Sequence, residues 1–223
     1  ALYGANAFNG IMIMRSRSPF DDQGISVGLK TGLTSQEAAG DNNFYDATIR
    51  MAHAFDDYFA AKATLSYLKG EEWHATDYRN TTGVGGTYIT GDRNTRNDYD
   101  GANVYGDEVA TNLGPAIGRV SRTGYDERDI MNYEAKSVKF GASLNYRPWG
   151  NDRLEIIWNS KYGTGNTVYQ GQNRYSLVNF LMEQHKLEAR GKNFFIRGYY
   201  TSEDAGDSYD TRFTAININR KWS

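Results

Sequence analysis

The sequence predicts an all-β protein, an antiparallel transmembrane β-barrel whose strands follow one another along the chain. Three observations support this prediction. Apolar and polar residues alternate over several segments, which is the pattern of a strand whose two faces meet different surroundings. The chain has 17 Tyr, 10 Phe and 24 Gly but only 3 Pro, a mixture that favours strands over helices. Shorter and longer polar connections also alternate, as they do in membrane-spanning barrels.

The overall composition agrees with this fold and excludes other classes. At 223 residues the chain is long enough for one domain with a sizeable core. A net charge of -2 gives no general attraction to nucleic acid, and the absence of cysteine excludes disulfides and thiolate metal sites. The mean hydropathy of -0.69 is that of a soluble protein, but spanning barrels share it because only alternate residues face lipid.

The first twenty residues predict a turn followed by a short buried strand. Gly4 and Gly10 allow tight backbone conformations, and the apolar run 11–14 is typical of a strand buried on both faces. Pro19 ends that strand because proline has no N–H to donate to a ladder. These residues alone fit any buried strand that follows a turn.

Three alternating strands are expected next, over residues 23–32, 45–55 and 59–67. In the first, Ile25, Val27 and Leu29 share one face, while Ser26 and Lys30 share the other. A polar loop over 34–43 and a short turn at 56–57 separate the three. Charged residues recur too often in these segments for an apolar helical stripe, so they are strands.

Residues 70–135 form a long polar segment with little sustained periodicity. A loop of this length inside a domain is usually functional or disordered. Its aromatic and basic side chains suit a sugar, a peptide or a protein partner, and they are the candidate ligand-binding residues. The candidates are Trp73, Tyr78, Tyr88, Tyr99, Tyr105, Arg79, Arg93 and Arg96. The alternative is that the tyrosines pack this loop onto the body of the barrel.

Alternation returns at residue 136 and predicts the remaining strands. We expect strands over 136–147 and 153–162, a less regular one over 180–190, and two more over 194–200 and 212–219. The total is about eight strands. The expected long connections are 34–43, 70–135, 163–174 and 203–209, and the short ones are 56–57, 147–152 and 191–193. Aromatic residues near the strand ends fit the interfacial girdles of a spanning barrel: Tyr45, Phe55, Phe59, Tyr67, Tyr146, Trp158 and Tyr162.

The sequence offers little catalytic or metal chemistry. His53, His74 and His185 lie far apart and match no metal-binding spacing. No arrangement of nucleophile, base and acid is indicated, so we expect neither an enzyme nor a bound cofactor. The acidic run 98–103 is similar to the oxygen-rich loops that bind calcium, but its ligand spacing is incomplete, which favours a solvated loop.

The segment from Tyr3 to Ile11 resembles the end of the plug domain of TonB-dependent receptors. In that family a Tyr-Gly-x-x-Ala-x-x-Gly-hydrophobic segment forms the last plug strand before the outer-membrane barrel. Gly4, Ala7 and Gly10 match this pattern. Residues 99–109 and 120–125 also resemble receptor sequences of this family, and the likeness covers nearly the whole chain.

The resemblance implies that residues 1–18 are the last plug strand and the plug–barrel junction. Residues 19–223 are then the first part of a plugged barrel of about 22 strands. The implied function is import of a nutrient (a glycan, a peptide or a metal chelate) energised through TonB, in the outer membrane of a Gram-negative bacterium. The body of the plug and the final strands are not in this sequence, so we expect a fragment of a larger barrel.

The resemblance also implies partners. They are outer-membrane lipid, the TonB motor acting through the plug, and an extracellular lipoprotein lid; nucleic acid is not among them. The truncation of the barrel, rather than the resemblance, suggests an outer-membrane assembly machine as a further partner. Three alternatives stay open. They are a self-contained eight-strand outer-membrane barrel with a structural or adhesive role, an incomplete barrel held by an assembly machine, and a soluble carbohydrate-binding domain.

Overall fold

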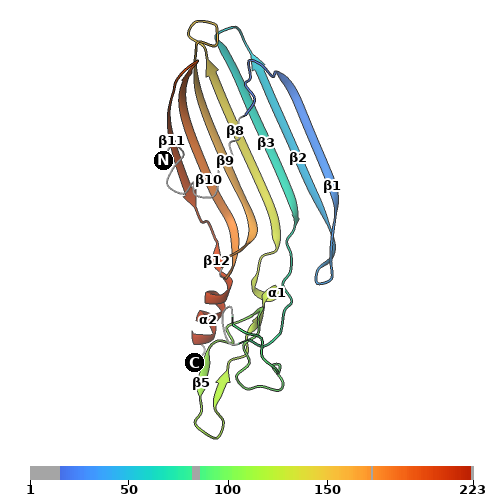
Figure 1. Ribbon diagram of the computed structural model, residues 1–223. Coiled ribbons are helices and arrows are strands. Elements are labelled where there is room, and N and C mark those ends of the chain that lie inside the picture. Colours follow the sequence, from blue (N-terminus) through green and yellow to red (C-terminus); the bar gives the residue numbers. More distant parts are fainter. Residues whose placement is uncertain (1–15, 82–85, 172, 222–223) are drawn as a thin grey trace.

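The computed structural model describes residues 16–81, 86–171 and 173–221. Its main feature is one antiparallel sheet in which seven long strands lie side by side in chain order, with β1 at one edge and β11 at the other (Figure 1). The long strands are β1 (Gly24–Gln36), β2 (Gly40–Ala54), β3 (Phe59–Glu71), β8 (Glu134–Tyr146), β9 (Leu154–Gln170), β10 (Arg174–Gly191) and β11 (Phe195–Asp204). The all-β antiparallel prediction is confirmed. The described residues do not close the sheet into a barrel.

The register of the sheet separates its side chains into two faces. Phe59 lies opposite Tyr146, which lies opposite Ile156 on the next strand. Facing residues project to the same side of a sheet, so this row extends one face across several strands. The same register places Lys62 opposite Ser143, and Ser143 opposite Asn159, on the other side. The sheet therefore has one apolar face and one polar face.

Few large side chains are buried by the sheet itself. Of its apolar residues, only Ala52, Ala60 and Ile157 are buried among the described residues. The rest of the buried apolar set lies outside the sheet and comprises Tyr99, Val104, Tyr105, Met131, Tyr133, Ala215 and Ile216. The sheet is thus a single layer without a covering second layer in the described chain.

The second feature is a folded segment between β3 and β8, residues 72–133, which we call the extension. It lies beyond the end of the sheet opposite the short turns 55–58 and 147–153 (Figure 1). Its regular elements are small, and they form two hairpins and one helical turn. They are β4 (Val104–Tyr105) paired with β7 (Tyr125–Asp126), β5 (Ala110–Asn112) paired with β6 (Arg119–Ser121), and α1 (Glu127–Ile130).

The expected long connections at 34–43 and 163–174 are wrong. The chain between β1 and β2 turns within residues 37–39, and β9 continues to Gln170 before β10 begins at Arg174. Both stretches are rich in Gly and polar residues, a composition that is typical of loops. Backbone hydrogen bonds to neighbouring strands hold them in the ladder despite that composition.

The expected last strand at 212–219 is also wrong, because this segment is the helix α2 (Thr211–Lys221). A short strand, β12 (Tyr209–Asp210), pairs with β10 just before it. The Asp210 side chain accepts a hydrogen bond from the Phe213 backbone N–H at 2.9 Å, which caps the first turn. Ala215 and Ile216 are buried against the extension, and this packing overrides the strand preference of the β-branched residues.

The weak alternation expected near residues 180–190 has a structural cause. Strand β10 changes register between Leu177 and Phe180, and Asn179 has a positive φ of 54°. Beyond this bulge, Glu183 and His185 lie on the apolar face, where their polar side chains interrupt the pattern. Neither helix in the described part of the chain is long and apolar enough to cross a lipid bilayer.

Substitution of Gly106 tests the packing of α2 on the extension. Its φ is +93°, and a Cβ placed there would lie 3.0 Å from the Ala215 carbonyl oxygen. We expect Gly106→Ala to cost about 1–3 kcal/mol and to speed hydrogen exchange of the α2 amides. Gly114→Ala is the matched control, because its φ is +90° but an added Cβ meets no atom within 4 Å. Equal exchange rates in α2 for the two variants would contradict the contact.

Candidate functional site: the polar face and the extension

The polar face of the sheet encloses a hollow of about 1100 Å³. Basic side chains are prominent in its lining, where Arg50, Lys62, Lys139 and Lys161 project from four different strands. The hollow therefore combines apolar surface with cationic groups, which suits a partner that has both apolar and negatively charged parts.

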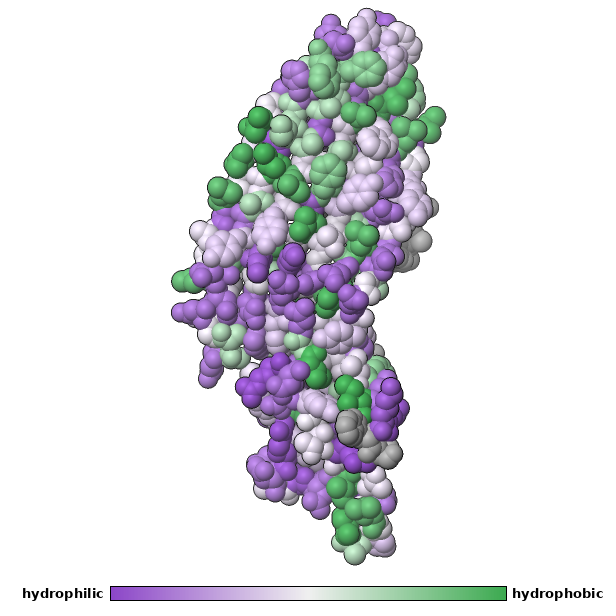
Figure 2. Space-filling view, turned by 180° about the vertical axis from the view of Figure 1, so that it is seen from behind, coloured by the Kyte–Doolittle hydropathy of each residue, from purple (hydrophilic) through white to green (hydrophobic). Residues whose placement is uncertain are grey.

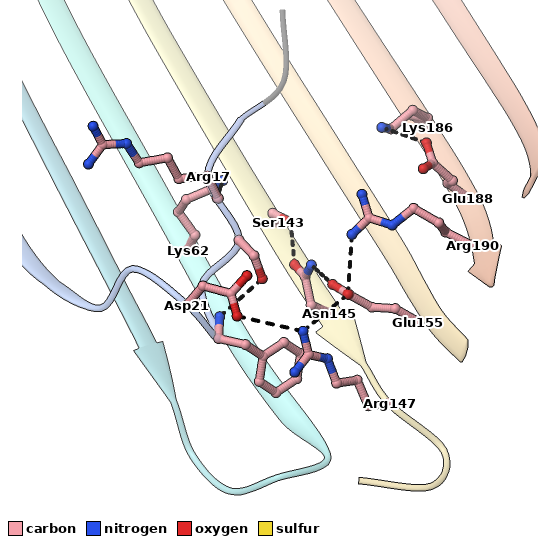
Figure 3. Close-up of polar contacts among 12 residues, drawn as sticks. Arg17, Asp21, Lys62, Ser143, Asn145, Arg147, Glu155, Lys186, Glu188 and Arg190 are labelled. Carbon is pink, nitrogen blue, oxygen red and sulfur yellow. Dashed lines mark hydrogen bonds and ion pairs between the residues drawn. The ribbon is translucent and has the colours of Figure 1, made fainter. Parts of the chain in front are cut away.

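A hydrogen-bonded network lies on this face near the short turns (Figure 3). Glu155 is its centre and is 3% exposed. Its carboxylate accepts a hydrogen bond from the Asn145 amide at 2.6 Å and another from Arg190 at 3.2 Å, and it pairs with Arg147 at 3.5 Å. Ser143 donates to Asn145 at 2.7 Å. A buried carboxylate requires this kind of compensation, so the network fixes the polar face in one arrangement.

Residues 16–22 lie across the same face. The Lys62 ammonium donates hydrogen bonds to the Ser16 hydroxyl at 2.7 Å and to the Arg17 carbonyl at 2.5 Å. The Arg50 guanidinium donates to the Asp22 carbonyl at 2.6 Å. The chain therefore enters the sheet from its polar side. The predicted junction residues Gly4, Ala7 and Gly10 lie outside the described residues, and residues 16–18 have no regular secondary structure.

The extension is held to the sheet by a buried carboxylate. Glu127 is fully buried and accepts hydrogen bonds from the hydroxyls of Tyr105 and Tyr133, each at 2.7 Å. Arg174, the first residue of β10, forms an ion pair with it at 2.8 Å. Burial, followed by the nearby Glu127 carboxylate, raises the pKa of both tyrosines, so both stay protonated hydrogen-bond donors.

A second group of contacts joins the extension to β1. The Gln36 amide donates to the Glu72 carbonyl at 3.0 Å, and its side-chain oxygen accepts from the His74 backbone N–H at 3.0 Å. The His74 ring stacks on Tyr133 at 3.7 Å between ring centroids and lies 2.9 Å from a Glu71 oxygen. The extension is therefore a folded unit with a defined position at the end of the sheet.

The structure places the five predicted aromatic ligand residues in two different environments. Trp73, Tyr78 and Tyr88 are exposed on the extension. Tyr99 and Tyr105 are buried, and their hydroxyls donate to the Tyr78 carbonyl and to Glu127, each at 2.7 Å. The exposed three are the ones that a ligand can reach without rearrangement, and ligand contact stays a prediction for all of them.

Each predicted arginine is paired with an aspartate of the extension. Arg79 pairs with Asp77 at 2.7 Å, Arg93 with Asp126 at 2.9 Å, and Arg96 with Asp98 at 2.9 Å. The first pair lies beside an aromatic ring, because the Arg79 guanidinium covers Tyr88 at 3.7 Å. The hydrogen bond from Arg79 holds the pKa of Asp77 well below its usual range.

Only one group of potential metal ligands occurs in the residues that the structure describes. The carboxylates of Asp100, Asp107 and Glu108 lie within 4.8 Å of one another. His53, His74 and His185 do not come together, as expected from their spacing. The sequence indicated the acidic segment 98–103 but not the contribution of residues 107 and 108, which follow a sharp bend at Gly106.

Comparison with known proteins finds no match for this chain, whether among protein-family models, curated proteins or solved structures. The assignment of function therefore depends on the molecule's own surfaces.

Glu127 provides a direct test of how the extension is held. Glu127→Gln removes the charge that compensates Arg174 and leaves fewer acceptors for the two tyrosines. Breaking a buried pair in this way costs about 3–5 kcal/mol. We expect faster hydrogen exchange throughout residues 99–133 and earlier proteolytic cleavage there, with the sheet unaffected. Asp129→Asn, an exposed acid on the same helix, should behave like the unmodified protein. Similar exchange in both variants would refute the anchoring role.

Proposed function

We propose that this chain forms part of an outer-membrane receptor that imports a nutrient. In this proposal the apolar face contacts lipid, the polar face lines the interior, and the extension lies at the outer mouth. The observation that supports it most is the composition of the two faces. The sequence motifs that resemble TonB-dependent receptors support the import of a nutrient energised through TonB.

The apolar face exposes large side chains on all seven long strands. Such a surface in a water-soluble monomer would be exceptional, since exposed apolar patches there rarely exceed a few hundred Å². The exposed apolar and aromatic residues of this face include Ile25, Val27, Leu29, Tyr45, Ile49, Met51, Leu65, Tyr67, Phe140, Leu144, Trp158, Leu187, Ile196 and Tyr200. Figure 2 shows hydrophobic residues gathered over the sheet and hydrophilic residues toward the extension.

The dimensions of the sheet agree with this placement. The shortest of the seven strands has 10 residues, and a tilted spanning strand needs about 9–11. Phe59 and Tyr67 mark the two ends of the apolar face on β3. Eight residue steps at about 3.3 Å, tilted by about 40°, give roughly 20 Å, close to the apolar band of about 25 Å.

Aromatic side chains are also concentrated at the short turns. Phe55, Tyr58, Trp149, Phe194 and Phe195 are all exposed there. Rings at this position fit the girdle at one membrane interface.

The two edges of the sheet favour a larger barrel over the eight-strand alternative. Among the described residues β1 pairs only with β2, and β11 pairs only with β10. An unpaired edge is costly in lipid because no water satisfies its backbone groups. Further strands, or an assembly machine that pairs with the edges, would supply these hydrogen bonds. A soluble carbohydrate-binding domain would instead have to cover the apolar face with protein.

Spin labels on two adjacent residues of β2 test which face of the sheet contacts lipid. The chain has no cysteine, so single spin labels can be attached at Ile49→Cys on the apolar face and Thr48→Cys on the polar face. In protein reconstituted into bilayers we expect the label at position 49 to be reached by oxygen, which concentrates in lipid. The label at position 48 should be reached by a water-soluble nickel chelate. The reverse result, or water access at both positions, would exclude lipid contact.

The import function requires a test of its own in cells. Cells lacking the protein, or lacking TonB, should lose uptake of one nutrient class among glycans, peptides and metal chelates. A variant with alanine at Trp73, Tyr78 and Tyr88 should need a nutrient concentration at least about tenfold higher, because each aromatic contact contributes about 0.5–1.5 kcal/mol. Tyr58→Ala, at the opposite end of the sheet, is the control. Unchanged uptake without TonB would contradict the proposal.

A further inference from the structure

A buried acidic cluster lies in the extension beside α2. The carboxylates of Asp100, Asp107 and Glu108 approach within 4.8 Å of one another, and Asp107 is 1% exposed. One Asp107 oxygen, Oδ2, accepts a hydrogen bond from the Gly101 N–H at 2.8 Å. Its other oxygen, Oδ1, is buried and has no hydrogen-bond partner in the described structure. A buried carboxylate oxygen without a partner is costly and rare, so it indicates a missing ligand.

The charge of the cluster defines what that ligand must supply. Glu108 pairs with Arg212 of α2 at 2.9 Å, whereas Asp100 and Asp107 have no ion pair within the described residues. Three carboxylates and the guanidinium paired with Glu108 leave a net charge of -2, and the Arg119 guanidinium, which donates to the Glu108 carbonyl at 3.4 Å, offsets part of it. A divalent cation would remove the remaining imbalance.

We propose that Asp100, Asp107 and Glu108 bind a calcium ion. All three ligands are carboxylate oxygens, which hard cations prefer. Two oxygens at about 2.3–2.6 Å from one calcium ion lie at most about 4.6–5.2 Å apart, and the ligand atoms of the cluster all lie within 4.8 Å of one another. Calcium also accepts flexible coordination geometry, whereas magnesium demands near-ideal octahedral geometry. Backbone carbonyls and water complete the coordination of such an ion.

Because the site lies between the extension and α2, a bound ion would connect these two parts of the molecule. Glu108 connects it to α2 through Arg212, and the Asn219 amide donates to the Gly106 carbonyl at 2.9 Å between the same two segments. Calcium therefore fastens the extension to α2. Removal of the ion leaves the three carboxylates to repel one another and loosens this contact.

The experiment uses the intact protein, purified in detergent and stripped with EDTA. Hydrogen exchange of peptides covering residues 99–109 is measured in EDTA and in about 1 mM calcium, a concentration suited to extracellular calcium modules. We expect calcium to slow exchange there at least about tenfold. Asp107→Asn should lose this response and, in EDTA, exchange no faster than the unmodified protein, because the amide removes a repelling charge. Asp98→Asn, a neighbouring acid paired with Arg96, should keep the response.

Three outcomes would overturn the site. The first is unmodified protein that gains no protection from calcium. The second is calcium protection retained in Asp107→Asn, and the third is calcium protection lost equally in Asp98→Asn. Protection that increases only on acidification from pH 8 to pH 6, with no effect of calcium, would show that a proton neutralises Asp107 and would also refute it. Equal protection by magnesium would overturn the assignment to calcium.

Discussion

The register of the antiparallel sheet is the constraint on which the rest of this molecule depends. Because facing residues project to one side, the ladder places Ile49, Leu65 and Phe140 in one row and Thr48, Ser66 and Lys139 in the opposite one. A slip of one residue between β2 and β3 would exchange these sets and bring charged side chains onto the apolar face. The polar network of Glu155 and the path of residues 16–22 follow from the same register, since both need basic side chains gathered on one side.

The extension shows how the ladder also positions structure outside the sheet. Glu71 and Glu134 are partners at the end of β3 and β8, so residues 72–133 leave and re-enter at adjacent points. The ladder thus brings the two ends of the segment together, a cost that grows only slowly with loop length, and the ordering of the segment itself depends on its own contacts. Polar contacts with distant strands fix the position of this segment, above all the ion pair between Arg174 of β10 and Glu127. The segment with the least regular sequence thus contains half of the buried apolar residues among those described, and all of the buried tyrosines.

Local pattern predicted the strands well where each face has one environment, as in residues 25–29 and 136–146. The prediction failed where residue composition indicates one structure but backbone hydrogen bonds or packing impose another. Residues 163–170 are polar yet remain in β9. Residues 211–221 include four β-branched side chains yet form α2, where Ala215 and Ile216 are buried. The candidate ligand residues were chosen by residue type. Sequence could not show that Tyr105 is buried against Glu127, since 21 residues, including the β5–β6 hairpin, separate them.

The acidic cluster differs from the other buried carboxylates of the molecule in how its charge is compensated. Glu155 has Arg147 and Arg190 beside it, Glu188 has Lys186 and Arg197, and Glu127 has Arg174. In each case a cation from another part of the chain compensates the buried charge. Asp107 is buried to the same degree, but Arg212, the guanidinium that forms an ion pair in the cluster, is paired with Glu108. A proton on Asp107 would neutralise one charge and leave Asp100 without a partner, whereas a divalent cation satisfies both aspartates at once.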